Sequence, residues 1–371
     1  MTIGSIKESG TENRCAIIPE VITQLLKLKT EQVLVEKDAG TASGFTDDML
    51  IQAGATIATR EQVLAKSNII LSINPPSEAD IAKASPSAIW IAAYNPYANK
   101  PIIDQCAAKG LSALALEFIP RSTRAQSMDI LSSMATVAGY KAVLTAATHL
   151  PRFFPMMMTA AGSIKPAKVL ILGAGVAGLQ AIATAKKLGA VVEAFDVRAA
   201  AKEEVMSLGA KFVEVDGAKD DRAAGGYAVE QDEDYKRKQA QAIHDHAIKS
   251  DVVICTAQIP GKKAPLLLTE ETVKLMSPGS VIIDLAASTG GNCACTTNDE
   301  LSYKYGVKII GQSNFPSDMP GDASRMFSRN VLNLLKLIID KEGNAKLDFD
   351  DDIIKACCIT HAGQVVSERL K

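Results

Sequence analysis

Short apolar runs alternate with stretches of helical periodicity over the first third of the chain. Strands that are buried on both faces of a parallel sheet have near-continuous apolar sequences, and helices connect them. Turn signals, Asn74-Pro75-Pro76 and Asn95-Pro96, end two of the runs. The pattern predicts strands at residues 32–36, 68–73, 88–93 and 111–118, and helices at residues 21–28, 46–52 and 101–109.

One long helix is predicted at residues 127–150, and residues 153–161 lead out of it into a second region of the same alternation. Met156, Met157 and Met158 are interpreted as packing at this crossover. The second region is expected to hold strands at 169–172, 191–195, 211–215, 252–255, 281–285 and 307–311, and helices at 202–208 and 235–249. A final long helix, residues 323–339, is expected to return to the first region.

These elements predict an α/β protein with two Rossmann-like domains, whose mostly parallel sheets are joined by two long helices. The first domain is expected to be discontinuous, with residues 1–130 and 323–371, and the second to hold residues 131–322. Residues 216–234 are polar, charged and glycine-containing, which is typical of a mobile functional lid or a linker.

The stretch from Val169 to Asp196 carries the strongest chemical signal. An apolar strand runs into a glycine turn with the spacing GxGxxG, a helix follows, and a second strand ends on an acid. Gly173 is expected to form the tight turn, Gly175 to let a pyrophosphate approach, and Gly178 to let the helix pack closely. Asp196, about twenty residues on, stands where a carboxylate binds an adenosine ribose. The pattern therefore predicts a dinucleotide site, with glycine-rich packing as the alternative.

Composition narrows the function classes. The formal net charge of −2 gives no general attraction to nucleic acid or to an anionic membrane. No window offers the uninterrupted apolar length that a membrane span needs, since Lys141, His149 and Pro151 break the richest candidate. A soluble chain is expected, and the start of the sequence does not predict export. The 7 cysteines lack zinc-type spacing, so reduced thiols and no metal site are expected.

A family resemblance rests on several ordered motifs. They are PRSTRAQSMDILSS at residues 120–133, FPMMMTAAG at 154–162, the glycine-turn segment at 172–190, IPGKKAP at 259–265, PGSVIIDLA at 278–286 and GGNC at 290–293. Together they resemble the NAD(H)-binding subunit, the alpha subunit or domain I, of proton-translocating NAD(P) transhydrogenase. Alanine dehydrogenase is the nearest enzyme relative and shares the two-domain plan.

The resemblance implies roles for the loop at residues 121–132. Arg121 and Asp129 would hold the carboxamide and ribose of the nicotinamide end, and Gln126 would reach toward NADP(H) on another subunit. Ser132 belongs to the same catalytic set, and Arg124 would be a cofactor contact. Arg121 and Asp129 could instead form a simple ion pair at a helix start, where a carboxylate is favourable in any protein.

The resemblance also implies contacts in the second domain. These are Val176, Asp196, Val197 and Arg198 at the phosphates and adenosine ribose, Gly226 and Tyr227 on the mobile loop, Gln239 behind it, and Thr256, Ala257 and Gln258 at the end of their strand. Gln258 replaces a residue that is usually apolar in the family. Arg198 could accept a 2′-phosphate, but the carboxylate of Asp196 would repel it, so NAD is expected over NADP.

A missing chemical group distinguishes the two enzymes of this family. An amino-acid dehydrogenase moves a proton as well as a hydride and needs a general acid or base. In alanine dehydrogenase those groups lie in loops that here are residues 72–75 and 92–95, and neither loop contains His or Lys. Hydride transfer between two nicotinamides requires ring apposition and no acid or base. The interpretation is therefore a transhydrogenase subunit, with a stand-alone alanine-dehydrogenase-like enzyme as the alternative.

The chain stops at Lys371 without membrane helices, so it is expected to be the separate soluble subunit of a multi-polypeptide enzyme. Its expected partners are the membrane-embedded subunits, the NADP(H)-binding domain of the beta subunit and a second copy of itself. The expected location is the cytoplasmic side of the inner membrane, as a peripheral subunit.

Overall fold

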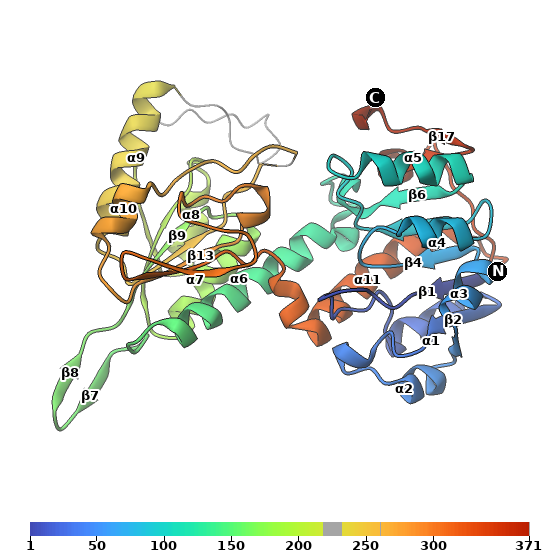
Figure 1. The fold of residues 1–371 in the computed structure, drawn as a ribbon, viewed down its shortest axis with the longest axis horizontal. Helices are drawn as coiled ribbons and strands as arrows, with labels where there is room; N and C mark the ends of the chain where they lie inside the picture. The colour runs from blue at the N-terminus through green and yellow to red at the C-terminus, as the bar shows by residue number, and fades with distance from the viewer. Residues whose placement is uncertain (218–231, 260, 371) are drawn as a thin grey trace. The chain divides into compact units, whose positions relative to one another are not determined.

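The computed structural model describes residues 1–217, 232–259 and 261–370. Its internal contacts divide the chain into two compact units (Figure 1). Unit 1 holds Met1–Met134 and Pro316–Lys371, and unit 2 holds Ala135–Phe315. The chain passes from unit 1 to unit 2 inside helix α6 (Ile130–His149) and returns just before helix α11 (Pro320–Ile338). Each unit is an α/β structure, as the sequence predicts.

Unit 1 is built on an 8-stranded sheet in the order β17-β16-β6-β5-β4-β1-β2-β3. The first six strands along the chain are parallel, and β16 runs antiparallel to β6. The six parallel strands have the order β3-β2-β1-β4-β5-β6, which is the doubly wound order of a Rossmann-like sheet. The strands are β1 (Thr2–Ser5), β2 (Gln32–Glu36), β3 (Thr56–Ala58), β4 (Ile69–Leu71), β5 (Ile89–Ala92), β6 (Ser112–Ala115), β16 (Cys358–His361) and β17 (Gln364–Val365).

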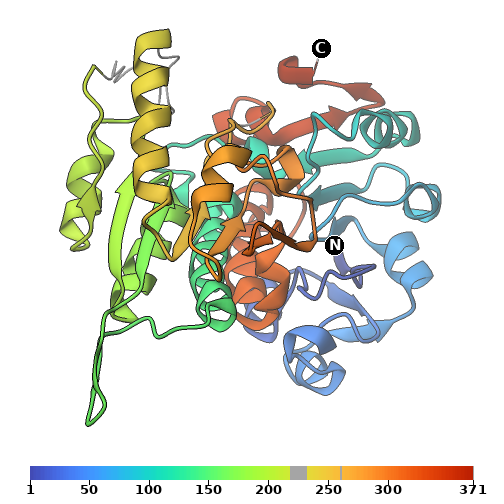
Figure 2. The ribbon, with the colours of Figure 1, turned by 60° about the vertical axis from the view of Figure 1, so that its left-hand side comes forward.

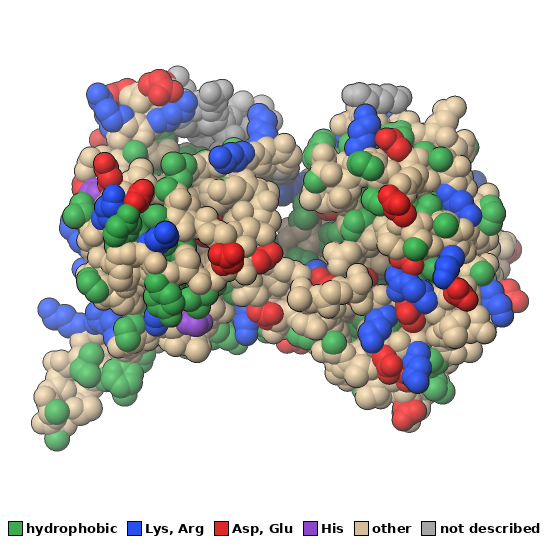
Figure 3. Space-filling view, in the orientation of Figure 1, with side chains coloured by type: hydrophobic (Ala, Val, Ile, Leu, Met, Phe, Trp, Pro, Cys, Tyr) green, Lys and Arg blue, Asp and Glu red, His purple; other side chains and the backbone are tan. Residues whose placement is uncertain are grey.

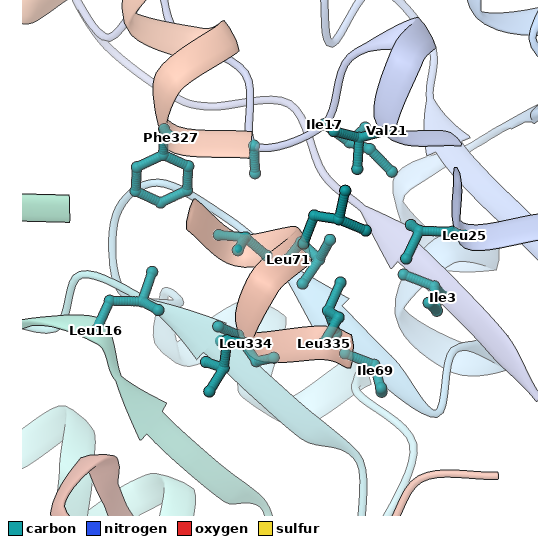
Figure 4. Close-up of a cluster of buried hydrophobic side chains, with 14 of the residues drawn as sticks. Ile3, Ile17, Val21, Leu25, Ile69, Leu71, Leu116, Phe327, Leu334 and Leu335 are labelled. Carbon is teal, nitrogen blue, oxygen red and sulfur yellow. The ribbon is translucent and has the colours of Figure 1, made fainter. Parts of the chain in front are cut away.

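Alternating residues of each strand belong to different hydrophobic clusters. Ile69 and Leu71 lie in a cluster with residues of α11, including Phe327, Leu334 and Leu335 (Figure 4). Ile70, between them, packs in the other cluster. Helices α1 (Pro19–Lys27), α2 (Asp47–Gln52), α11 and α12 (Asp352–Cys357) cover the first face, and α3 (Arg60–Lys66), α4 (Glu78–Lys83) and α5 (Lys100–Lys109) cover the second. Burial on both faces explains why these strands lack a polar alternation.

Unit 2 repeats this plan with a 7-stranded sheet in the order β11-β10-β9-β12-β13-β15-β14. Within this sheet, β14 runs antiparallel to β15, and the other described strand pairs are parallel. Helices α7 (Val176–Lys187), α8 (Ala201–Ser207) and a portion of α6 cover one face, and α9 (Glu233–Ala247) and α10 (Glu270–Leu275) the other (Figure 2). The strands are β9 (Lys168–Leu172), β10 (Val191–Phe195), β11 (Lys211–Phe212), β12 (Val252–Cys255), β13 (Val281–Asp284), β14 (Leu301–Lys304) and β15 (Val307–Ile310).

Helix α6 is apolar over most of its length. Of the helices that the structure describes, it is the one long and apolar enough to cross a bilayer by length and composition, which corrects the expectation that no window is. Ile130 lies in the core of unit 1, whereas Ala142, Val143 and Ala146 lie in the core of unit 2. A Cβ on Gly139 would lie 2.1 Å from the carbonyl oxygen of Ala177, so α6 lies directly against α7 there. Its apolar positions thus serve the cores of both units.

The methionine run at the crossover does not pack as predicted. Residues Met157–Thr159 (β7) and Gly162–Ile164 (β8) form a separate two-stranded hairpin. Met156 and Met158 are 60% and 81% exposed, and hydrophobic side chains are visible on this hairpin in Figure 3. The interpretation of these residues as buried packing is therefore wrong, because the hairpin is separate from the layers of both large sheets.

In unit 1 the strand order reverses between β1 and β4, and the side chain of Glu8, which follows β1, binds the loop after β4 there. In doubly wound sheets this is the place where a ligand binds. Here the Glu8 carboxylate accepts hydrogen bonds from the Ile73 N–H (2.6 Å), the Asn74 N–H (3.2 Å) and the Asn74 side-chain amide (3.1 Å). Burial raises the pKa of Glu8 from 4.5 to about 7. Glu8 therefore holds the loop that follows β4.

Replacement of Glu8 by Gln should change how stability depends on pH. The pKa of Glu8 is higher in the folded state, so its contribution to stability is full below about pH 4.5 and is lost as the pH rises through about 7. The wild type should lose about 3 kcal/mol relative to Glu8→Gln over that range. Urea unfolding of both proteins at pH 4.5, 6 and 8 measures this. A difference between them that stays constant with pH would contradict the assignment.

Candidate functional site

In unit 2 the strand order reverses between β9 and β12, and the glycine turn follows β9 at this point. Gly173 has a φ of +101°, a conformation that glycine adopts without strain, and its N–H donates to the carbonyl of Phe195 at 2.8 Å. Helix α7 begins at Val176, and its N-cap residue is Gly175, which has no side chain to cap the first-turn N–H groups. The first-turn N–H groups and the positive end of the helix dipole therefore provide an anion site.

The three glycines of the turn differ in what an added Cβ would meet. A Cβ on Gly178 would lie 1.9 Å from the carbonyl oxygen of Gly173, so α7 packs directly on the turn. A Cβ on Gly173 would lie 2.5 Å from the hydroxyl of Thr256. At Gly175, in contrast, no atom of the residues that the structure describes lies within 4 Å of the Cβ position. Space and backbone N–H groups thus coincide at Gly175, which fits the close approach of a pyrophosphate.

Asp196 lies at the end of β10 and is bound to the glycine turn. Its carboxylate accepts from the Ala174 N–H at 2.7 Å, the Arg198 N–H at 2.8 Å, and the Arg198 guanidinium at 2.9 and 3.0 Å. The guanidinium also donates to the carbonyl of Ala174 at 3.2 Å. Asp196 and Arg198 therefore form one charge-paired unit that holds the turn against β10.

The loop after β12 is held by three consecutive anchors. The hydroxyl of Thr256 donates to the carbonyl of Gly173 at 3.0 Å, and the side-chain amide of Gln258 donates to the carbonyl of Leu285 at 2.8 Å. Between them, the Ala257 N–H donates to the Asn292 side chain at 3.1 Å, and Asn292 donates to the Ala257 carbonyl at 2.9 Å. Gln258 thus uses its side chain to fix the loop.

Asp284 stabilises this loop through Asn292, and the sequence pattern did not indicate that role. Its side chain is fully buried at the end of β13. It accepts from the Asn292 N–H (2.8 Å), the Cys293 N–H (3.1 Å) and the Thr296 hydroxyl (2.8 Å). A strand-ending acid followed by a glycine pair is the signal that could have revealed it. Asp284 thereby orients Asn292, which in turn orients Ala257.

The remaining predicted residues of unit 2 fall into two groups. Val176, Val197 and Gln239 lie at the start of α7, after β10 and in α9, respectively, and none is buried. Gly226 and Tyr227 lie outside the described residues. Hydrogen bonds thus join the glycine turn, Asp196 and Thr256–Gln258 at one edge of the sheet, the carboxyl ends of β9, β10 and β12.

The loop at residues 121–132 belongs to unit 1. Arg121 and Gln126 are exposed, and Ala125 between them is buried. Asp129 precedes α6, and its carboxylate accepts from the Ser132 N–H at 3.0 Å and the Ser132 hydroxyl at 2.6 Å. Asp129 therefore caps α6, which explains why the helix begins at Ile130 and not at residue 127 as predicted.

Arg124 makes contacts that its predicted role does not include. Its guanidinium donates two hydrogen bonds of 2.7 Å to the carboxylate of Asp351 and a further one to Asp352. These partners raise the pKa of Arg124 and lower that of Asp351. Both acids belong to the C-terminal segment, for which the sequence predicted no element.

Comparison with known proteins agrees with this architecture. The family described as "Alanine dehydrogenase/PNT, N-terminal domain" matches residues 4–138, and its C-terminal counterpart matches residues 142–368. An NAD(P) transhydrogenase subunit alpha polypeptide of Rhodospirillum rubrum is 46% identical, over 97% of this chain and 96% of the relative. Alanine dehydrogenase of Bacillus subtilis is 29% identical over 99% and 93%. The crystal structure of transhydrogenase from Sinorhizobium meliloti superposes with a TM-score of 0.91 at 41% identity, covering 99% and 100% of the two chains.

The geometry of the turn predicts different effects on stability for two glycine substitutions. Gly178→Ala should lower the free energy of unfolding by about 1–3 kcal/mol. The added Cβ would meet the carbonyl oxygen of Gly173, so α7 would have to move away from the turn. Gly175→Ala should change stability by less than about 0.5 kcal/mol, because its site is open and its φ of −73° suits any residue. Urea unfolding of the two variants measures both effects. Equal losses would contradict the packing role of Gly178.

Proposed function

Because this chain belongs to the family of NAD(P) transhydrogenase alpha subunits, we propose that it binds NAD(H) and exchanges hydride with NADP(H) held by a partner subunit. The reaction is reversible, and membrane subunits couple it to proton translocation. The observation that carries the proposal is the glycine turn of unit 2, with an open anion site at Gly175 and a carboxylate at Asp196. These residues fit a dinucleotide.

The coenzyme assignment follows from charge at the end of β10. The Asp196 carboxylate suits the ribose hydroxyls of NAD(H) and disfavours the 2′-phosphate of NADP(H). Arg198, the cation that could attract that phosphate, is paired with Asp196. Val176 and Val197 would complete the phosphate and adenosine contacts, and Thr256, Ala257 and Gln258 would form the opposite wall.

The nicotinamide end is assigned to the loop of unit 1. Arg121 and Asp129 would orient the carboxamide and ribose, and Ser132, which already donates to Asp129, would fix that carboxylate. Gln126 is exposed and would extend toward the NADP(H) of the partner. Gly226 and Tyr227 would close over the bound cofactor, with Gln239 of α9 behind them.

The chemistry asked of this chain is positioning. The bound nicotinamide supplies the hydride-carrying carbon, and the protein brings the two rings together and excludes water. In the loops at residues 72–75 and 92–95, the Ser72 hydroxyl donates to the Asn74 carbonyl at 2.6 Å, and Tyr94 is fully buried. Glu8, whose pKa is about 7, contacts the first loop, but the backbone of that loop occupies its carboxylate oxygens. This supports a reaction that transfers no proton at the reacting carbons.

The proposed assembly has three kinds of partner. They are the NADP(H)-binding domain of the beta subunit, the membrane-embedded subunits, and a second copy of this chain, which would form a homodimer. The complex would lie on the cytoplasmic side of the inner membrane with this chain as a peripheral subunit. Light scattering on the purified chain measures the homodimer directly.

The direct test mixes the purified chain with the recombinant NADP(H)-binding domain, NADPH and an NAD⁺ analogue whose reduced form absorbs at a separate wavelength. Reduction of the analogue is expected only when both proteins are present. No turnover with both proteins folded and associated would reject the proposal. Steady NADH formation from NAD⁺ and L-alanine by this chain alone would favour the alanine-dehydrogenase alternative.

Replacement of Asp196 by Ala should weaken NADH binding by about 1–3 kcal/mol, because the ribose hydroxyls lose a charged acceptor. Asp251→Ala is a matched control, since Asp251 also bridges an arginine, Arg152 at 2.7 Å, and a backbone N–H of β9, Lys168 at 2.8 Å. It should lose stability without losing NADH affinity. Fluorescence titration with NADH and thermal unfolding give the two readouts. Unchanged affinity in Asp196→Ala would contradict the ribose assignment.

Replacement of Gln126 by Ala should slow hydride transfer far more than it weakens NADH binding, because its proposed contact is on the partner's nucleotide. Gln105→Ala, at a glutamine of α5 that bonds Glu78 on the opposite face of unit 1, serves as the control and should leave both unchanged. Single-turnover transfer with the NADP(H)-binding domain, together with NADH titration, separates the two effects. Equal losses in both would place Gln126 in the NAD(H) site.

A further inference from the structure

The exposed loop at residues 121–129 is tied to the C-terminal segment of the chain. The separation between Arg124 and Asp351 is 227 residues, and their side chains meet through two parallel hydrogen bonds of 2.7 Å. This bidentate geometry restrains the direction of the guanidinium as well as its position. The Asp351 side chain is 15% exposed, so the acid is the more rigid partner.

Asp351 has a second role that fixes it in place. It is the N-cap of α12, and its carboxylate accepts from the Ile353 N–H at 2.9 Å and the Ile354 N–H at 3.4 Å. Ile353 and Ile354 are buried in the core of unit 1. The carboxylate that holds Arg124 is thereby attached to the hydrophobic core through the helix it caps.

Another long-range contact holds the other half of the loop. The carbonyl oxygen of Ser127 accepts from the side-chain amides of Asn330 (2.8 Å) and Asn333 (3.0 Å), both on α11. Ala125 and Met128 are buried in the same core cluster as α11. Residues 124, 125, 127 and 128 are thus anchored, and Gln126 stands exposed between the anchors.

We propose that Asp351 and Arg124 act as a positioning pair that sets the conformation from which this loop presents Arg121 and Gln126 to the nucleotides. The inference rests on the proposed function of the loop and assigns Arg124 as a residue that positions Gln126, which follows it by two residues. Asp352 adds a second carboxylate to the same guanidinium. Arg124 is therefore charge-paired within this chain, although its side chain is 51% exposed.

Two substitutions isolate the pair. Arg124→Ala removes the guanidinium, and Asp351→Asn removes the carboxylate charge while keeping a good helix N-cap. Lys83→Ala is the control, because it breaks an exposed ion pair of unit 1 between Lys83 on α4 and Glu61 on α3. Three quantities are measured for each protein. They are hydrogen–deuterium exchange of residues 121–129, the dissociation constant for NADH, and single-turnover hydride transfer with the NADP(H)-binding domain.

In both variants, exchange of the loop amides should accelerate, and hydride transfer should slow by about tenfold or more, because misplacement of a positioning group is costly. NADH affinity should stay within about twofold of the wild type. The control should match the wild type in all three. Unchanged loop exchange and unchanged transfer in the variants would overturn the proposal. Weakened NADH binding with normal transfer from the bound cofactor would also overturn it and make Arg124 a cofactor contact.

The same measurements separate this inference from the proposed function. If the wild type transfers no hydride to NADP⁺ on its partner, the proposed function fails, and loop exchange alone decides whether the pair positions the loop. If the wild type transfers hydride and the variants transfer equally fast with unchanged exchange, the positioning role fails and the proposed function stands.

Discussion

A single buried carboxylate organises the candidate site of unit 2. Asp284 is removed from water at the end of β13, which would be costly without partners, and backbone N–H groups and a hydroxyl surround it. Those donors belong to the segment that carries Asn292, and Asn292 holds the loop after β12 through both its side-chain oxygen and its side-chain nitrogen. The loop after β12, which contacts the glycine turn through Thr256, therefore depends on a buried acid.

The two units solve the same folding problem and use its result differently. Both sheets have the doubly wound strand order, so both have a crevice where that order reverses. In unit 2 the crevice is lined by backbone N–H groups and has open space at Gly175. In unit 1 the Glu8 carboxylate occupies the equivalent position and binds the loop after β4. One fold thus provides a candidate binding site in one unit and a support for the loop after β4 in the other.

Sequence pattern predicted the parts of this structure that depend on local signals. The family and the fold class are confirmed, and β2, β10 and β12 match their predicted bounds, because their short, mostly apolar runs indicate buried strands. Short amphipathic helices were missed at Arg60–Lys66 and Glu78–Lys83, although the capping boxes Thr59/Gln62 and Ser77/Asp80 could have indicated them. A contact between distant residues, such as that of Arg124 with Asp351, leaves no periodic trace in the sequence. The exposed Met158 was misjudged because composition does not reveal which surface covers a side chain.

The attachment of the loop to a late segment of the chain bears on how the protein is made. The partners of Ser127 lie on α11, and the partner of Arg124 follows every parallel strand of both sheets in the sequence. A ribosome that has completed those strands has not yet released Asp351. Until that residue emerges, residues 121–129 lack their bidentate anchor, so the nascent polypeptide can fold unit 2 before this loop of unit 1 adopts its final conformation. The loop at residues 121–129 is therefore fixed late, although it is synthesised before all of unit 2.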